Sequence, residues 1–355
     1  MDNLKYIPFA NIDINDSFFD SLRDSYEGFN DWFAKKSCAG AAAWVYYDDS
    51  DKLCDFLYLK DETEQLNMDT SALPQKRRLK IGTFKIERRG TNRGERFIKK
   101  ILDTAILGGY MEVYVTLFDD TEELLHLKHF LEKYGFIEVG SKTNPAGRCE
   151  KVMLRDMSRR IGNTITDYPY VATNDGFKYV LSIYPEYHTK LFSDSMLTTE
   201  KYDILQDVSE TNSIYKLYLC WMKDVAYLRP NDKLIIYRTS DYQGPAYYRS
   251  VATSLCTVLE VKTNHDFGNV DEFTKYCNKY SVFEEKDLRK CFSGKTCFVI
   301  KMMYNVAFPS RVIRKNMIEE IGIPSDMYWG FFRLSDNQFY SILSKGEVDE
   351  RYIIN

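Results

Sequence analysis

Residues 79–102 read LKIGTFKIERRGTNRGERFIKKIL, and this stretch decides the fold of the first half of the chain. Its first nine residues alternate in polarity, as in a strand with one buried face. Its last nine place apolar residues at helical spacing. Between them, two glycines flank a turn rich in arginine. Because the first turn of a helix has unpaired N–H groups and partial positive charge, this strand–turn–helix predicts an anion site.

The charges around this turn favour the same interpretation. Residues 76–100 contain 11 basic and two acidic residues, whereas the whole chain has a net charge of −4. The chain as a whole is therefore not expected to bind polyanions in general. The turn lacks the G-K-[ST] ending of a Walker loop and the third glycine of a G-x-G-x-x-G loop. A solvated basic surface remains the alternative to an anion site.

The bulk composition predicts a two-domain globular protein. The chain has 355 residues, of which 44% are hydrophobic and 15% aromatic, enough for two cores. Without a long apolar run or a signal-peptide layout, a cytoplasmic protein with no membrane span is expected. The 8 cysteines form no C-x-x-C motif and are expected to be reduced thiols, mostly buried. His126 and His129 lack a third ligand nearby, so no metal is expected.

The first half predicts a layered α/β domain of residues 1–157. Two short helices broken at Gly28 come first, and helices and strands alternate after the opening hairpin. The predicted elements are helices over 12–36, strands 40–49 and 53–62, a loop over 62–78, strand 79–87, helix 94–109, strand 110–118, helix 119–135, and strands 136–140 and 150–157.

The arginine-rich turn resembles the pyrophosphate loop of the GNAT family of N-acetyltransferases, whose pattern is Q/R-x-x-G-x-G/A. Arg89 takes the first position and Gly94 the last, while Asn92 replaces the middle glycine. Two later segments, MEVYVTLF and HFLEKYGFIEVG, resemble the family's fifth strand and its closing helix and strand. The resemblance covers about residues 5–157 and implies a GNAT α/β domain with a central mixed sheet and acetyl-CoA as cosubstrate.

The resemblance also implies which residues hold acetyl-CoA. In the family, the strand before the loop lies along the pantetheine arm and the loop amides bind the pyrophosphate. The positions carried over to this chain are Thr83, Phe84, Lys85, Ile86, Arg88, Arg89, Gly90, Thr91, Asn92, Arg93, Gly94 and Glu95.

Acetyl transfer needs a neutral amine, a polarised thioester carbonyl and a stabilised oxyanion. Many family members protonate the departing thiolate with a tyrosine, but the equivalent position here is Leu131. Tyr134, three residues later, is the candidate general acid. Glu87 and Glu62 are the candidate bases, acting directly or through water. Ordinary surface carboxylates are the alternative for both glutamates.

The second half predicts a small, partly open β-barrel with short helices over residues 168–355, after a polar linker over 158–167. The β-rich runs are 177–185, 232–240, 250–262, 296–306 and 331–343, and the predicted helices are 211–222, 270–280 and 310–322.

The segment YLRPNDKLIIYRTS, residues 227–240, resembles PUA-like domains of the ASCH/EVE type. Such domains often bind RNA or modified bases. Stacking aromatic side chains beside cations suit single-stranded nucleic acid, which makes Lys216, Trp221, Tyr237 and Arg238 the candidate RNA or ligand contacts. The alternative is that the aromatic residues belong to the core.

Together the two resemblances imply an acetyl-CoA-dependent N-acetyltransferase whose acceptor amine is RNA-linked, such as that of a charged tRNA in toxin-type relatives. An enzyme for a protein or small-molecule amine is the first alternative. A non-catalytic sensor of CoA or RNA is the second, because Leu131 and Asn92 depart from the family pattern. A homodimer and an antitoxin partner are left open.

Overall fold

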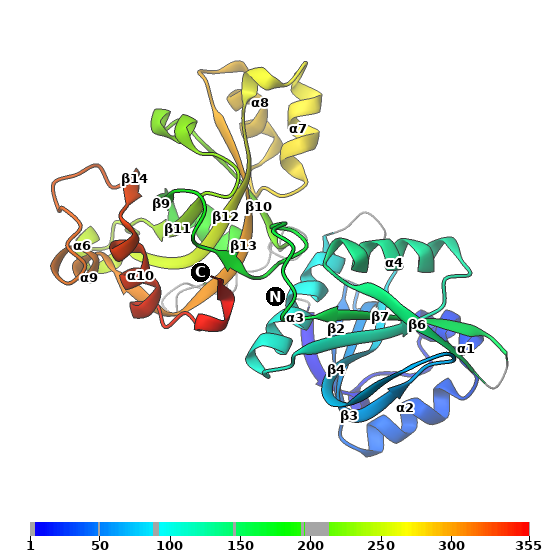
Figure 1. The fold of residues 1–355 in the computed structure, drawn as a ribbon. Coiled ribbons are helices and arrows are strands. Elements are labelled where there is room, and N and C mark those ends of the chain that lie inside the picture. Colours follow the sequence, from blue (N-terminus) through cyan, green and yellow to red (C-terminus); the bar gives the residue numbers. More distant parts are fainter. Residues whose placement is uncertain are drawn as a thin grey trace. The chain divides into compact units, whose positions relative to one another are not determined.

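The computed structural model describes residues 4–48, 50–87, 92–144, 147–192, 195 and 213–354. The chain divides into two compact units, Asp2–Asp167 and Tyr168–Asn355 (Figure 1). The segment expected to be a linker belongs to the first unit. There the Asp167 carboxylate accepts hydrogen bonds from the N–H groups of Gly162 and Asn163, at 2.8 and 3.1 Å. We place the domain boundary between Asp167 and Tyr168.

The first unit is built on a mixed sheet, as the family resemblance implies. The sheet has seven strands in the order β1-β2-β3-β4-β5-β7-β6, and the sequence patterns did not predict β1. All neighbours are antiparallel except β4 and β5, which run parallel. The strands are β1 (Leu4–Pro8), β2 (Ala42–Tyr47), β3 (Leu53–Asn67), β4 (Ala72–Ile86), β5 (Glu112–Leu117), β6 (Ile137–Thr143) and β7 (Cys149–Asp156).

Helices cover both faces of this sheet (Figure 1). On one face lie α1 (Asp20–Ser25) and α2 (Phe29–Cys38), and on the other lie α3 (Arg93–Leu107) and α4 (Glu122–Lys133). Successive side chains of β3 and β4 point alternately to one face of the sheet and to the other. Phe56 packs with Phe19 of the first helical layer, while Phe84 meets Phe97 of α3 and Phe130 of α4. The core of the unit therefore has two layers.

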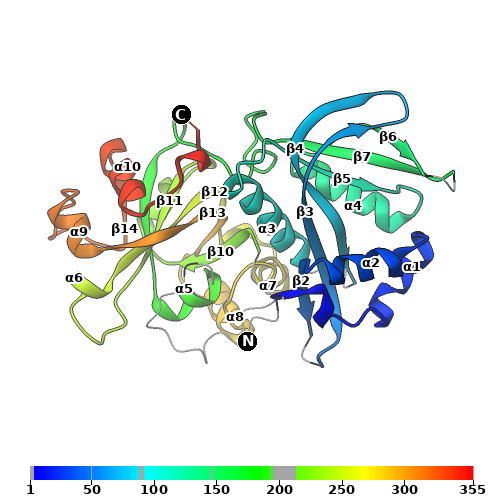
Figure 2. The ribbon, with the colours of Figure 1, turned by 90° about the horizontal axis from the view of Figure 1, so that it is seen from below.

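The loop predicted over residues 62–78 is wrong, because β3 and β4 continue through it as one long hairpin. Its residues are polar because much of the hairpin is exposed, and its strands are joined by ion pairs such as Arg77 with Asp61 at 2.8 Å. At the tip, the N–H of Thr143 on β6 donates to the Asp69 carboxylate at 2.8 Å. Figure 2 shows the tip curving over β6 and β7.

The second unit contains a six-stranded sheet in the order β10-β13-β12-β11-β9-β14, in which only β9 and β11 run parallel. Among the described residues the edge strands β10 and β14 do not pair, so the sheet is open. The strands are β9 (Lys178–Ile183), β10 (Tyr215–Cys220), β11 (Lys233–Arg238), β12 (Val251–Thr263), β13 (Phe298–Ile313) and β14 (Phe331–Leu334), with a separate pair of β8 (Val171–Ala172) and β15 (Ile353–Ile354).

Short helices surround this sheet (Figure 1). They are α5 (Pro185–Leu191), α6 (Ala246–Arg249), α7 (Val270–Asn278), α8 (Glu285–Ser293), α9 (Arg314–Glu319) and α10 (Asp336–Lys345). The helix predicted over 211–222 is wrong where it is described, because β10 is a strand with all of its residues buried. A strand buried on both faces shows no alternation of polarity, so its apolar run resembles a buried helix. The predicted run 331–343 divides into β14 and α10.

Candidate active site

The centre of the first sheet opens where β4 and β5 separate. Their parallel pairing comprises three residue pairs and ends at Ile81 with Val115. Beyond that point β4 stays paired with β3, and β5 stays paired with β7. Alternate backbone groups of a strand point to opposite sides, so every second N–H of residues 82–86 faces the gap.

Gly82 marks the start of this separation. The register between β3 and β4 shifts here, because Tyr58 pairs with Thr83 and Leu59 pairs with Ile81. Gly82 is thus the extra residue of a β-bulge, which bends the strand. A Cβ atom on Gly82 would lie 2.6 Å from Cδ1 of Tyr58, so only glycine fits without movement of the ring.

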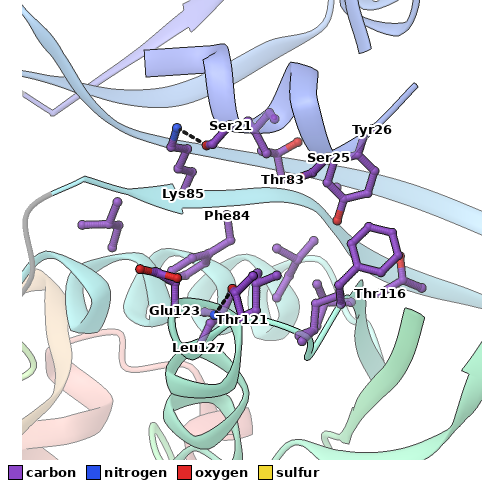
Figure 3. Close-up of a pocket in the computed structure, with 18 of the residues that line it drawn as sticks. Ser21, Ser25, Tyr26, Thr83, Phe84, Lys85, Thr116, Thr121, Glu123 and Leu127 are labelled. Carbon is purple, nitrogen blue, oxygen red and sulfur yellow. Dashed lines mark hydrogen bonds between the residues drawn. The ribbon is translucent and has the colours of Figure 1, made fainter. Parts of the chain in front are cut away.

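A cavity of about 1070 Å³ occupies the space between the separated strands. Its floor is β4 from Ile81 to Ile86 and β5 from Val115 to Leu117, and α1, α2 and α4 supply its walls. Figure 3 shows Phe84 pointing toward α4, whereas Lys85 points toward α1, where its Nζ donates to the Ser21 hydroxyl at 2.7 Å. Burial lowers the pKa of Lys85, opposed by Glu87. The cavity therefore has a helical wall on each side of β4.

One end of the cavity reaches the first turn of α3, where Gly94 lines it. The first intrahelical hydrogen bond runs from the N–H of Arg96 to the carbonyl of Asn92 at 3.3 Å, so the earlier amides point toward the N-terminal end. Asn92 has φ −80°. Because this φ is negative, the backbone conformation at position 92 does not require the glycine of the family pattern.

Arg93 fastens this helix start to the sheet. Its guanidinium lies 3.1 Å from the Asp55 carboxylate of β3 and 4.4 Å from the centre of the Tyr46 ring, and both charged side chains are buried. Burial raises the pKa of Asp55 to about 6, and the charge of Arg93 opposes this rise. The Arg93 side chain is thus engaged away from the cavity, and only its backbone is available to an anion.

The structure brings part of the expected acetyl-CoA contact set to the cavity. Lining it are Thr83, Phe84, Lys85, Ile86 and Gly94. Asn92, Arg93 and Glu95 are buried beside it and do not line it. Arg88, Arg89, Gly90 and Thr91 lie outside the described residues.

None of the three proposed acid and base residues lines the cavity. Tyr134 is fully buried at the end of α4, with its ring 5.2 Å from that of Phe130. Glu62 accepts hydrogen bonds from Lys60 at 2.6 Å and from the Tyr114 hydroxyl. Although burial raises the pKa of Glu62, these two hydrogen bonds and the charges of Lys80 and Lys60 together outweigh this effect, and the pKa is lowered overall.

Glu87 lies just beyond β4 and pairs with Lys52 at 3.3 Å, in the turn between β2 and β3. Each of these three side chains could exchange a proton with a reacting amine in the cavity only through a water molecule or after a rearrangement. The sequence placed these residues near the site along the chain, but it did not show which way their side chains point.

The end of the cavity opposite α3 is aromatic. Tyr26 lines it with its ring 5.2 Å from that of Phe118, and Figure 3 shows Tyr26 and Thr116 at this same end. Arg148 stacks on Phe118 at 3.8 Å, donates to the Ser25 carbonyl at 3.0 Å and pairs with Asp120 at 2.7 Å. Arg148 therefore ties the last residue of α1 to the segment that follows β5.

Sequence reasoning missed most of the cavity walls. On α4, Glu123, Leu127 and Phe130 line the cavity at spacings of three to four residues, which is one helix face. The sequence alone could have indicated this helix face, and it could have indicated the β-bulge from the glycine at position 82 within a strand. Tyr26 and Thr116 carried no such signal, since their meeting depends on strand pairing.

In the second unit, the four proposed RNA contacts do not share one surface. Lys216 is fully buried, with its ammonium 5.4 Å from the centre of the Tyr304 ring. Arg238 is also buried, and Trp221 is exposed. Tyr237 lines a small cavity of about 200 Å³, which Tyr184, Tyr242, Arg314 and Trp329 also line and the other three proposed contacts do not.

This small pocket is aromatic with one cation. The Arg314 guanidinium lies 4.2 Å from the centre of the Trp329 ring, and the Tyr237 and Trp329 rings are 5.4 Å apart. The Nε1–H of buried Trp329 finds no acceptor among the described residues. A planar ligand with an acceptor atom would suit these groups.

Within the described part of the chain, no three His, Cys, Asp or Glu side chains are arranged to hold a metal ion. The described residues include all eight cysteines, none of which forms a disulfide and six of which are buried. No helix of the described segments is long and apolar enough to cross a membrane.

No family model matches the chain, and no curated protein matches its sequence. Solved structures that it resembles include an ASCH protein from Zymomonas mobilis, with 11% identity over 48% of this chain and 96% of that one, at a TM-score of 0.34. A GNAT family acetyltransferase from Elizabethkingia anophelis with acetyl-CoA bound shows 12% identity over 44% and 99%, at 0.31. An aminoglycoside 6'-acetyltransferase type Ii shows 18% over 44% and 99%, at 0.32.

These neighbours come from the two families that the two halves of the sequence resemble. The strand order and the separated central pair, rather than these likenesses, define the candidate site.

Proposed function

We propose that the first unit is an acetyl-CoA-dependent N-acetyltransferase. The observation that carries the proposal is the separation of β4 and β5 beyond Ile81 and Val115, which leaves an opening of about 1070 Å³ that runs to the N-terminus of α3. A long, flexible thioester with a diphosphate at one end matches a cavity of this layout, because strand amides and a helix N-terminus supply its hydrogen-bond donors.

In this proposal, the helix start at Gly94 and the arginine-rich segment before it bind the diphosphate. The N–H groups of residues 82–86 that face the gap bind the pantetheine amides and polarise the thioester carbonyl, which stabilises the developing oxyanion. The acceptor amine enters from the end lined by Tyr26 and Thr116. The proposed general acid Tyr134 does not line the cavity, so a thiolate leaving group, with an ordinary pKa of about 8.5, would take its proton from water or from the amine.

Calorimetric titration with acetyl-CoA and with CoA tests the proposal first, and we expect saturable binding of both. A thiol-release assay then tests transfer to a panel of amines: spermidine, phenethylamine, a tripeptide and puromycin, which is an aminoacylated nucleoside. The absence of binding would refute the assignment. Binding without release to any acceptor, including charged tRNA, would instead favour a non-catalytic sensor.

For the acceptor, we propose an RNA-linked amine such as that of a charged tRNA, as in a toxin-like enzyme. The aromatic pocket of the second unit favours this choice, since base stacking on aromatic side chains contributes about 1–3 kcal/mol per base. Its buried Trp329 donor and the adjacent Arg314 could bind a nucleobase and the neighbouring backbone. Transfer to a protein or small-molecule amine is the alternative that the amine panel would reveal.

The Trp329→Ala variant tests the RNA step. We expect it to weaken binding of a short single-stranded RNA at least tenfold in a fluorescence anisotropy titration. Tyr227→Ala is the matched control, because Tyr227 is an exposed aromatic residue outside the pocket. If wild-type protein does not bind the RNA, or if both variants bind it equally well, the RNA-linked acceptor is wrong.

A further inference from the structure

A carboxylate that sequence reasoning passed over lies beside the aromatic end of the large cavity. Glu150 is the second residue of β7, and β7 pairs with β5 so that Val152 is opposite Thr116. Residues two apart on a strand share a face, and diagonal neighbours across a strand pair are within reach of long side chains. The pairing therefore places Glu150 on the same face as Thr116.

The neighbours of Glu150 connect it to the cavity. Thr116 lines the cavity, and its hydroxyl lowers the pKa of the Glu150 carboxyl, as a nearby donor would. The charge of Glu150 in turn raises the pKa of Tyr26, which also lines the cavity. Burial raises the pKa of Tyr26 to about 12, and the charge of Glu150 adds to this rise. Tyr26 therefore stays protonated at neutral pH and is not itself a base.

Glu150 is half-buried, and within the described segments it makes no ion pair within 4.0 Å. Burial raises its pKa, while Lys80 on β4, Lys142 on β6, Arg148 just before β7 and the Thr116 hydroxyl oppose the rise. A carboxylate with a raised pKa is a stronger base than an exposed one. Paired surface carboxylates such as Glu138 on β6 lack this property.

We propose that Glu150 accepts the proton of the acceptor's ammonium group through the Thr116 hydroxyl, and so delivers a neutral amine to the thioester. This inference rests on the proposed acetyl transfer. Thr116 is the group that touches the acceptor, and Glu150 acts through it.

The ammonium gives one proton to the Thr116 oxygen while the Thr116 hydroxyl proton passes to Glu150. The neutral nitrogen attacks the carbonyl carbon, a C–N bond forms and the C–S bond breaks. The thiolate takes the second nitrogen proton, directly or through water, and Glu150 later returns its proton to solvent. The products are the amide, CoA thiol and one released proton.

The test compares Glu150→Gln with Glu138→Gln in the full-length protein, with puromycin or whichever amine of the panel the wild type acetylates. Glu138 is the matched control, because it is a carboxylate in the same half of the sheet, paired with Lys128 at 2.6 Å and outside the cavity. We expect Glu150→Gln to lower kcat/KM at pH 7 by about 100-fold or more, mainly through kcat, with the Kd for CoA within about twofold of wild type. Glu138→Gln should behave as wild type.

The pH profile separates proton transfer from structural support. In Glu150→Gln we expect kcat/KM to rise about tenfold per pH unit up to the pKa of the amine, because only amine already neutral in solution reacts. Thr116→Val should resemble Glu150→Gln, and Thr116→Ser should keep most of the wild-type rate.

Two results would overturn the inference. Equal activity of the two glutamine variants would refute the role of Glu150 while leaving acetyl transfer intact. Wild-type protein that binds acetyl-CoA but acetylates no amine would refute the transferase proposal and Glu150's role together.

Discussion

Gly94 offers the sharpest test of where the diphosphate binds. It stands in the first turn of α3 and lines the cavity. A Cβ added there would lie 3.1 Å from Cζ of Phe130 and 3.6 Å from Cδ1 of Ile86. The side chain of Gly94→Glu would start between these two residues, so it has to extend into the space proposed for the diphosphate.

The expected loss of affinity follows from Coulomb's law. A carboxylate about 5 Å from a phosphate charge, at an effective dielectric of about 20 to 40, costs about 2–3 kcal/mol. The Kd for CoA should therefore rise about 30- to 150-fold. The fold should survive, since an acidic residue in the first turn of a helix stabilises it by about 0.3–1 kcal/mol.

Calorimetric titrations with two ligands isolate the charge effect. CoA contains the diphosphate and pantetheine does not, so Gly94→Glu should weaken CoA far more than pantetheine. Gly94→Ala is the control for bulk, because it asks Phe130 to move by only a few tenths of an ångström. If Gly94→Glu binds CoA within twofold of wild type, or if both ligands weaken equally, the diphosphate does not bind at this helix start.

Two further predictions concern stability. Arg93→Met should destabilise the first unit by about 3–5 kcal/mol, because it leaves the buried Asp55 without its partner, and hydrogen exchange of the β3 amides would measure this. The pKa of Asp55 in the folded protein is raised to about 6, so ionisation of Asp55 lowers the stability of the fold as the pH rises. The destabilisation caused by Arg93→Met should therefore be smaller at pH 5 than at pH 8. Equal destabilisation at the two pH values would contradict this explanation. Gly82→Ala should lower the free energy of unfolding by about 1–3 kcal/mol and weaken CoA binding, because the added Cβ would lie 2.6 Å from the Tyr58 ring. Unchanged stability and affinity would show that glycine is not required at the bulge.

Sequence patterns predicted the elements with regular periodicity. Strand 79–87 and helix 94–109 appear as β4 and α3 with shifted ends, because alternation and helical spacing are local properties. The patterns failed for the polar hairpin at 62–78 and for β10, where side chains are exposed or buried on both faces and no period remains. Ion pairs between strands and the burial of a strand on both faces depend on residues that are far apart in the sequence, so a short stretch of sequence does not show them.

For the candidate site, the sequence by itself determined the strand, the glycine-flanked turn and the helix that point to an anion. Only the tertiary structure decided that Arg93 turns to Asp55, that Tyr134 is buried, and that β4 and β5 separate into a cavity. It also brought Tyr26, Thr116 and Glu150 together from distant parts of the chain. Strand pairing and the Gly82 bulge determine which of these side chains lie close together. Strand pairing depends on contacts between distant parts of the chain, whereas sequence periodicity shows only which face of an element is buried.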